Sequence, residues 1–123
     1  MTDTPPQPHR LRLRLVFDGA AMLGPGKADL LELIRDTGSI AAAGRQMGMS
    51  YKRAWQLVET LNAIFTAPLV ESTRGGQSGG GARLTPDGAA VLALYRRIEA
   101  KADAAAAAEI ADLRQMLRDP PAG

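Results

Sequence analysis

Four residues near the middle of the chain have side chains suited to binding an anion or the edge of a base: Tyr51, Lys52, Arg53 and Gln56. Ser50 precedes them and is predicted to share their binding role. It is also a favourable helix cap, so the four are expected in the first turns of a helix. Positive charge there opposes the helix dipole, which favours an anionic partner over a structural role. A glutamine one turn further along can bind an adenine edge. The competing interpretation is a solvated helix surface.

The charge distribution along the chain is compatible with contact to nucleic acid. The formal net charge is only +2, but residues 39–97 carry seven Lys and Arg against three Asp and Glu. Residues 99–123 carry three basic against five acidic residues. A basic middle beside a mildly acidic tail suits a nucleic-acid-binding surface, although basic surfaces are also common in other proteins.

Composition argues against several other functions. The chain has no cysteine, and its one histidine, His9, lies in a proline-rich leader, so we expect no metal, no cofactor and no catalytic site. Asp29, Glu32 and Asp36 recur at helical spacing and are interpreted as a solvated helix face. No apolar run of about 18 residues and no secretory signal occur, so we expect a cytoplasmic protein that does not enter membranes.

The elements that position the basic cluster form a helix-turn-helix pattern. Ser39 caps a short helix over residues 40–47, Gly48 provides a left-handed turn, and the capped helix after it runs over residues 51–65. Gly44 is small enough to let the two helices approach closely, and Arg45 faces outward toward backbone phosphate. The second helix is anchored by an inner face of Ala54, Val58 and Leu61. The alternative is an ordinary pair of core helices.

A glycine-rich hairpin follows these helices and predicts a wing. Strands are expected at residues 69–72 and 82–84, and residues 10–17 alternate in polarity like a half-buried strand. The predicted contacts of the wing with phosphate are its basic roots and its glycine tip: Arg74, Gly75, Gly76, Gly79, Gly80 and Arg83. A surface loop without function is the alternative. The expected fold is mainly α with a small β-hairpin wing, a winged helix-turn-helix with a long C-terminal dimerisation helix.

The last predicted helix, residues 86–117, is too long for so small a domain to cover. Thirty residues of helix span about 45 Å. Its apolar stripe is expected to bind a second copy of the chain, through Val91, Leu94, Tyr95, Ile98, Ala102, Ile110 and Leu113. The predicted organisation is a disordered leader (1–9), a winged helix-turn-helix domain (10–85), a C-terminal dimerisation helix (86–117) and a disordered tail (118–123).

Several of these segments resemble the N-terminal DNA-binding domain of the ModE-type, molybdate-responsive regulators, which is similar to the LysR-type winged helix. The resemblance covers roughly residues 10–117. It is carried by Ser39-Ile40, Gly48-Met49-Ser50-Tyr51-Lys52-Arg53-Ala54-Trp55, Leu69-Val70-Glu71, the glycine-rich loop and Leu84-Thr85-Pro86-Asp87-Gly88. It implies a homodimer joined through the terminal helices that reads a palindromic operator. The molybdate-binding modules of that family do not follow here, so no molybdate is expected as a partner.

The sequence therefore predicts a bacterial transcriptional regulator that binds double-stranded DNA as a homodimer. Two alternatives use the same scaffold. One is a protein–protein adaptor, which is distinguished from a DNA-binding regulator by the salt dependence of binding to duplex DNA. The other is an architectural DNA binder without sequence preference, which random duplex would compete away.

Overall fold

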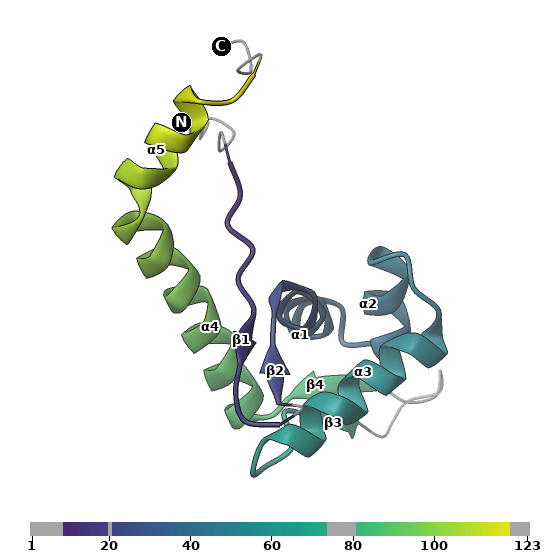
Figure 1. Ribbon diagram of the computed structural model, residues 1–123. Helices are drawn as coiled ribbons and strands as arrows, with labels where there is room; N and C mark the ends of the chain where they lie inside the picture. The colour runs from purple at the N-terminus through teal and green to yellow at the C-terminus, as the bar shows by residue number, and fades with distance from the viewer. Residues whose placement is uncertain (1–8, 20, 74–80, 119–123) are drawn as a thin grey trace, which may run out of the picture.

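The chain folds into a three-helix unit with a β-hairpin, from which a long helix projects (Figure 1). The computed structural model describes residues 9–19, 21–73 and 81–118. The elements in order are β1 (Leu15–Val16), β2 (Met22–Leu23), α1 (Pro25–Thr37), α2 (Ile40–Gln46), α3 (Tyr51–Ile64), β3 (Val70–Thr73), β4 (Gly81–Leu84), α4 (Pro86–Ala105) and α5 (Ala107–Gln115). The winged helix-turn-helix architecture predicted from the sequence is confirmed.

The core lies where α1, α2 and α3 meet the hairpin and α4. Each helix contributes side chains at helical spacing, and α1 alone buries Ala28, Leu30, Leu31 and Ile34. Removing a leucine or isoleucine side chain from water contributes about 1.5–3 kcal/mol. Tyr95 of α4 is also buried, with 1 % of its surface exposed, and closes the core from the side of the long helix.

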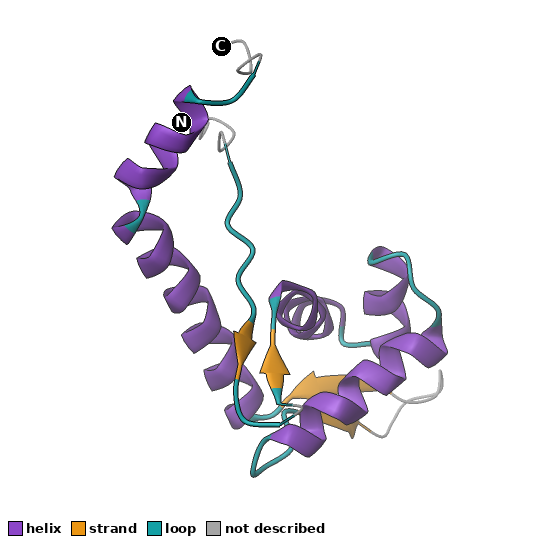
Figure 2. Cartoon of the chain, viewed as in Figure 1, coloured by secondary structure: helices purple, strands orange, loops and turns teal. Residues whose placement is uncertain are grey.

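Strands form two separate antiparallel pairs, β1 with β2 and β3 with β4 (Figure 2). In the second pair Val70 lies opposite Leu84 and Thr73 opposite Gly81. Val70 and Ala82 face the core, and the amide of Ala82 donates to the carbonyl of Gly38 at 3.0 Å. The hairpin is thereby attached to the end of α1. Its tip lies outside the described residues, and with it the predicted contacts Arg74, Gly75, Gly76, Gly79 and Gly80.

The predicted strand over residues 10–17 is much shorter than expected. Only Leu15 and Val16 pair with β2, because β2 itself is two residues long. The preceding residues run extended beside α4 (Figure 1), with the Tyr95 hydroxyl donating to the carbonyl of Leu13. Burial raises the pKa of Tyr95. His9, which the sequence placed in the leader, lies 2.8 Å from Asp103, measured from Nε2 to Oδ1.

The single terminal helix expected over residues 86–117 is divided at Ala106. The backbone there has φ −100° and ψ 9°, which ends α4 and begins α5. The break falls in a run of alanines, whose side chains offer little surface for packing the helix onto the body. None of the residues of α5 is buried. Among the described residues, no helix combines the length and apolarity needed to cross a membrane.

Arg96 joins α4 to α1 through a cluster of ion pairs. Its guanidinium lies 2.9 Å from Asp29, 3.0 Å from Glu32 and 3.0 Å from Glu99. Asp29 and Glu32 were interpreted from the sequence as a solvated helix face, and the structure places them in this contact instead. Burial lowers the pKa of Arg96, but the hydrogen bonds to the three carboxylates outweigh it and raise the pKa overall.

Replacing Arg96 with Gln is expected to lower the free energy of unfolding by about 1–2 kcal/mol, because three carboxylates lose their shared cation. The loss is modest because these side chains are partly exposed to solvent. Urea unfolding measures the effect. Arg97→Gln, an exposed neighbour, is the matched control and should change the stability by less than about 0.5 kcal/mol. Equal effects of the two substitutions would contradict a structural role for the cluster.

Candidate nucleic-acid interface

The turn between α2 and α3 is held by backbone hydrogen bonds and by close packing. Ser39 caps α2, its hydroxyl accepting from the amide of Ala42 at 3.0 Å, and Gly48 adopts φ +74°, in the left-handed region. The amide of Met49 then donates to the carbonyl of Gly44 at 2.9 Å. A Cβ added at Gly44 would lie 2.9 Å from the Cβ of Ala54. A side chain at position 44 would therefore collide with the Ala54 methyl group, so this close approach of the two helices requires glycine.

Helix α3 is buried along one side and exposed along the opposite side. Ser50 caps it, its hydroxyl accepting from the amide of Arg53 at 3.0 Å. Ala54, Val58 and Leu61 are buried in the core as predicted. Since a helix turns 100° per residue, the face opposite these three carries Lys52 and Gln56. Both are exposed.

The remaining residues predicted on α3 lie on its flanks. Tyr51 is exposed and meets Trp55 edge-to-face, with ring centroids 6.4 Å apart, and the indole Nε1 of Trp55 donates to the Tyr51 hydroxyl. Trp55 is half-buried in a small hollow between α2, α3 and the hairpin, lined also by Ser39, Ser72 and Gly81. Arg53 lies on the other flank. The structure thus brings the four predicted residues of α3 to one exposed end of the helix.

The predicted basic residues outside α3 have different surroundings. Arg45 of α2 is exposed, and no ion pair engages it within the described part of the chain. Arg83 of β4 is exposed as well, but its Nε lies 3.4 Å from Glu71 across the hairpin. An anion approaching the root of the hairpin therefore competes with Glu71 for this guanidinium.

Asn62 is a positioning residue that the sequence patterns did not single out. Its side-chain oxygen accepts from the amides of Leu69 and Val70 at 2.8 and 3.1 Å, and its side-chain nitrogen donates to the carbonyl of Val70 at 3.1 Å. These bonds attach the end of α3 to the start of β3, so they set the hairpin relative to the exposed face of α3. In the sequence, the one indication of this role is that Asn62 is a polar residue on the side of the helix that faces the protein.

Within residues 9–19, 21–73 and 81–118, no group of three or more His, Asp or Glu is arranged to hold a metal ion. The exposed end of α3 offers cationic, hydroxyl and amide groups. Such groups bind phosphate oxygens and base edges.

Comparison with protein families finds a match over residues 27–89, about half of the chain. The family is described as bacterial regulatory helix-turn-helix protein, lysR family. The matched segment begins in α1 and ends at the start of α4, so it contains the whole helix-turn-helix and the hairpin.

Several curated relatives are similar over a comparable region. The molybdenum-pterin-binding protein MopA of Rhodobacter capsulatus is 45% identical over 93 residues, which are 76% of this chain and 35% of MopA. The molybdenum transport protein ModE of Azotobacter vinelandii is 39% identical over 88 residues, covering 72% of this chain and 33% of that protein. The DNA-binding transcriptional dual regulator ModE of Escherichia coli K12 is 39% identical over 71 residues, covering 58% and 27%. The chain spans about a third of the length of these relatives.

Replacing Asn62 with Ala should destabilise the fold by about 2–3 kcal/mol, because two amides and a carbonyl at the start of β3 lose a partner in a partly buried place. Hydrogen exchange should speed up at the amides of Leu69 and Val70. Thr60→Ala is the control, since that hydroxyl donates only to the carbonyl of Gln56 within α3. Unchanged protection of both amides in the Asn62 variant would refute the role assigned to this side chain.

Proposed function

The chain belongs to the lysR family of bacterial regulatory helix-turn-helix proteins, and from this premise we propose that it is a sequence-specific transcriptional regulator acting as a homodimer on a palindromic DNA operator. The family match indicates a DNA-binding regulator and not an enzyme. Sequence reading, the dimer and the symmetry of the operator are the parts proposed.

One observation carries the proposal: the first two turns of α3 are buried on one side and bear Tyr51, Lys52, Arg53 and Gln56 on the rest of the surface. An α-helix is about 10–12 Å across and the major groove about 12 Å wide, so the exposed side of α3 fits in the groove. In this placement Lys52 and Gln56 face the bases. Arg45 and Arg83 reach backbone phosphates from the neighbouring elements.

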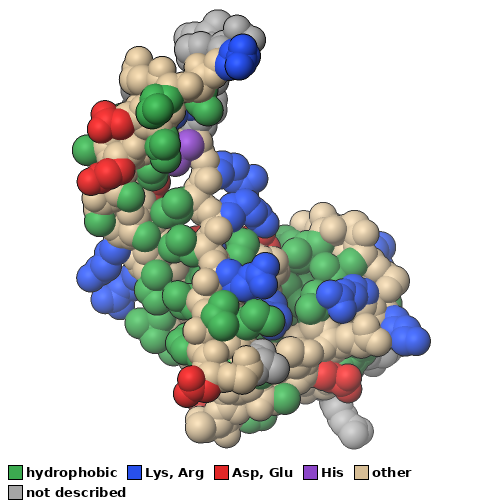
Figure 3. Space-filling model, viewed as in Figure 1, with side chains coloured by type: hydrophobic (Ala, Val, Ile, Leu, Met, Phe, Trp, Pro, Cys, Tyr) green, Lys and Arg blue, Asp and Glu red, His purple; other side chains and the backbone are tan. Residues whose placement is uncertain are grey.

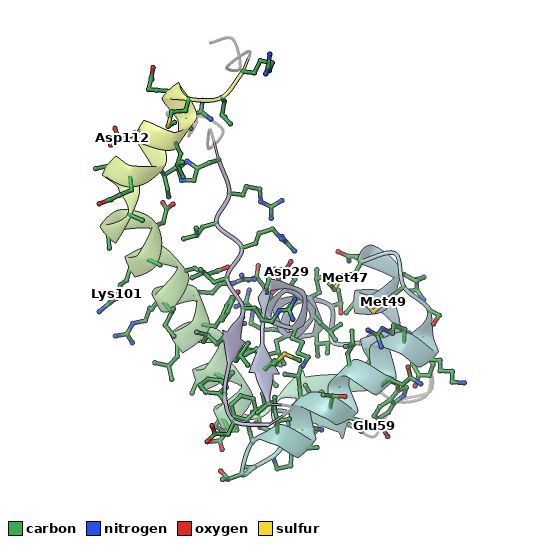
Figure 4. All side chains as sticks on the ribbon, in the orientation of Figure 1. Asp29, Met47, Met49, Glu59, Lys101 and Asp112 are labelled. Atoms are coloured by element: carbon green, nitrogen blue, oxygen red, sulfur yellow. The ribbon has the colours of Figure 1, made fainter. Side chains whose placement is uncertain are left out.

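Glu59 limits how much of α3 can enter the groove. It lies one turn beyond Gln56 on about the same face, is exposed, and is labelled on α3 in Figure 4. A carboxylate is repelled by phosphate, so the contact is restricted to the N-terminal half of the helix.

The exposed apolar surface of α4 and α5 supports the homodimer. Leu94 and Leu113 expose 54% and 65% of their surfaces, Ile98 is exposed, and Val91, Ala102 and Ile110 are half-buried. Met116 and Leu117, which the sequence analysis did not include, are exposed too. Nine residues of helix without buried side chains are only marginally stable alone, and a second copy would supply the missing contacts. Tyr95 is the exception among the predicted interface residues, because it is buried in its own chain.

Selection of bound sequences from a random duplex pool tests sequence reading. The wild-type chain should enrich a palindrome, and Lys52→Ala or Gln56→Ala should lose about 1–3 kcal/mol of discrimination at single positions of each half-site. Thr60→Ala serves as the control with unchanged preference. Binding without enrichment of any sequence would indicate the architectural DNA binder. Absence of salt-dependent binding to duplex DNA would indicate the protein–protein adaptor.

Molybdate is expected to leave DNA binding by these 123 residues unchanged. Repeating the DNA titration with added molybdate checks this expectation.

Replacing both Leu94 and Ile98 with Glu should convert the dimer into a monomer, because the two new carboxylates would lie in the apolar interface proposed between the protomers. Affinity for the full palindrome should fall by about 100-fold or more, because each half-site then binds alone. Sedimentation at micromolar concentration measures the first effect and a DNA titration the second. Ala89→Glu with Ala93→Glu, on another exposed side of α4, should change neither. A wild-type monomer that binds the palindrome tightly would exclude the proposed dimer.

A further inference from the structure

Three cations from separate parts of the fold meet in one surface hollow beside α3. The hollow has a volume of about 350 Å³ and is lined by Arg14 from the extended N-terminal segment, Lys27 from α1 and Arg53 from α3. These residues are far apart in the sequence. Among the described residues lining the hollow there is no Asp or Glu.

None of the three cations has a carboxylate partner within the part of the chain that the structure describes. Arg96, Arg83 and Arg35, by contrast, each lie within 4 Å of at least one carboxylate. Bringing three unpaired like charges together costs free energy in water, and an anionic partner would repay that cost.

The walls of the hollow strengthen the attraction. Met22, Met47, Met49 and Leu57 supply its apolar lining, and the two methionines of the turn between α2 and α3 are labelled in Figure 4. A cleft with charge of one sign and apolar walls focuses the electric field. The Lys27 ammonium donates to the carbonyl of Met22 at 3.1 Å, which fixes its position and leaves two N–H groups for another acceptor.

The hollow lies on the flank of α3 opposite the hairpin. Tyr51 and Trp55, one turn apart, face the hollow shared with α2 and the hairpin, whereas Arg53 and Leu57, also one turn apart, face the cationic hollow. Lys52 and Gln56 lie between the two flanks. Figure 3 shows Lys and Arg side chains gathered on the viewed face, along the extended N-terminal segment and across to α3.

We propose that Arg14 and Lys27, together with Arg53, bind backbone phosphates of the DNA strand opposite to the one that the hairpin contacts. The inference rests on the proposed DNA-binding function. A helix about as wide as the major groove lies close to both of its walls. In this arrangement the hairpin and α2 contact the phosphates along one wall of the groove, and the cationic hollow contacts those along the other wall. Neither Arg14 nor Lys27 belongs to the helix-turn-helix.

The test compares Arg14→Gln/Lys27→Gln with Arg97→Gln/Lys101→Gln in salt titrations of operator binding. Both pairs remove two positive charges per protomer, and Lys101 points away from the body on the outer side of α4 (Figure 4). Sedimentation and urea unfolding establish that all variants keep the oligomeric state and stability of the wild type.

Losing two phosphate contacts per protomer, four in the dimer, should make the slope of log affinity against log salt shallower by about 3.6 for the first pair. Between about 50 and about 200 mM salt, the advantage of the wild type over that variant should therefore shrink by more than about a hundredfold. Base preference should stay the same, and the control pair should keep the wild-type slope.

Operators with single neutral methylphosphonate linkages locate the contact. Some neutral linkages should weaken DNA binding by the wild type but not weaken binding by Arg14→Gln/Lys27→Gln any further. Another set should have no further effect on binding by Arg83→Gln. Within each half-site, the two sets should lie on opposite strands. A wild-type slope and an unchanged linkage map in the double variant, with operator binding intact, would overturn this inference alone. Absence of duplex binding by the wild type would overturn the proposed function as well.

A titration of the free protein with inorganic phosphate separates backbone phosphate from a free anion. Weak, non-saturating binding is expected, because a single ion meets only part of the surface that the DNA strand covers. Saturable phosphate binding that the double variant abolishes, together with an unchanged DNA slope, would assign the hollow to a small anion and refute the contact with DNA.

Discussion

The contact between Gly44 and Ala54 is the constraint on which the position of the exposed first turns of α3 depends. With only 2.9 Å between the Cβ of Ala54 and the place where a Cβ of Gly44 would lie, α2 and α3 are held at one separation. Interiors packed at this density do not deform continuously. The turn from Met47 to Met49 is therefore short, Ser50 falls at the helix cap, and the first turns of α3 emerge from the core at a fixed angle.

Two polar contacts extend this rigidity from the helix pair to its surroundings. Asn62 attaches the hairpin to the end of α3, and Arg96 attaches α4 to α1 through Asp29 and Glu32. A displacement of α4 is thereby transmitted to α1, and through the shared core to α3. The exposed end of α3, the hairpin and α4 are thereby linked through one core, whereas no residue of α5 is buried.

The sequence was sufficient for the elements whose evidence is local. Periodic apolar residues predicted α3, and Ser39, Gly48 and Ser50 predicted the turn between α2 and α3. The sequence did not predict features that depend on distant partners. Asn62 and Arg96 are recognisable only once β3 and α1 lie beside them, and Tyr95 was assigned to an exposed stripe because its contact with Leu13 joins residues 82 positions apart. Ala106 breaks a run of alanines that by propensity alone favours a continuous helix.

The same long-range contacts imply an order of assembly during synthesis. Leu13 and His9 leave the ribosome early, yet their partners Tyr95 and Asp103 follow 82 and 94 residues later. The helices from α1 to α3 contact near neighbours in sequence and can collapse as they emerge, whereas contacts that close a long loop form late. The extended segment before Leu15 is therefore translated before the core, and its contacts with α4 form after it. On a nascent chain, the pairing of β1 with β2 can place Arg14 beside Met22 early, whereas its neighbour Leu13 gains its partner only when α4 has been made.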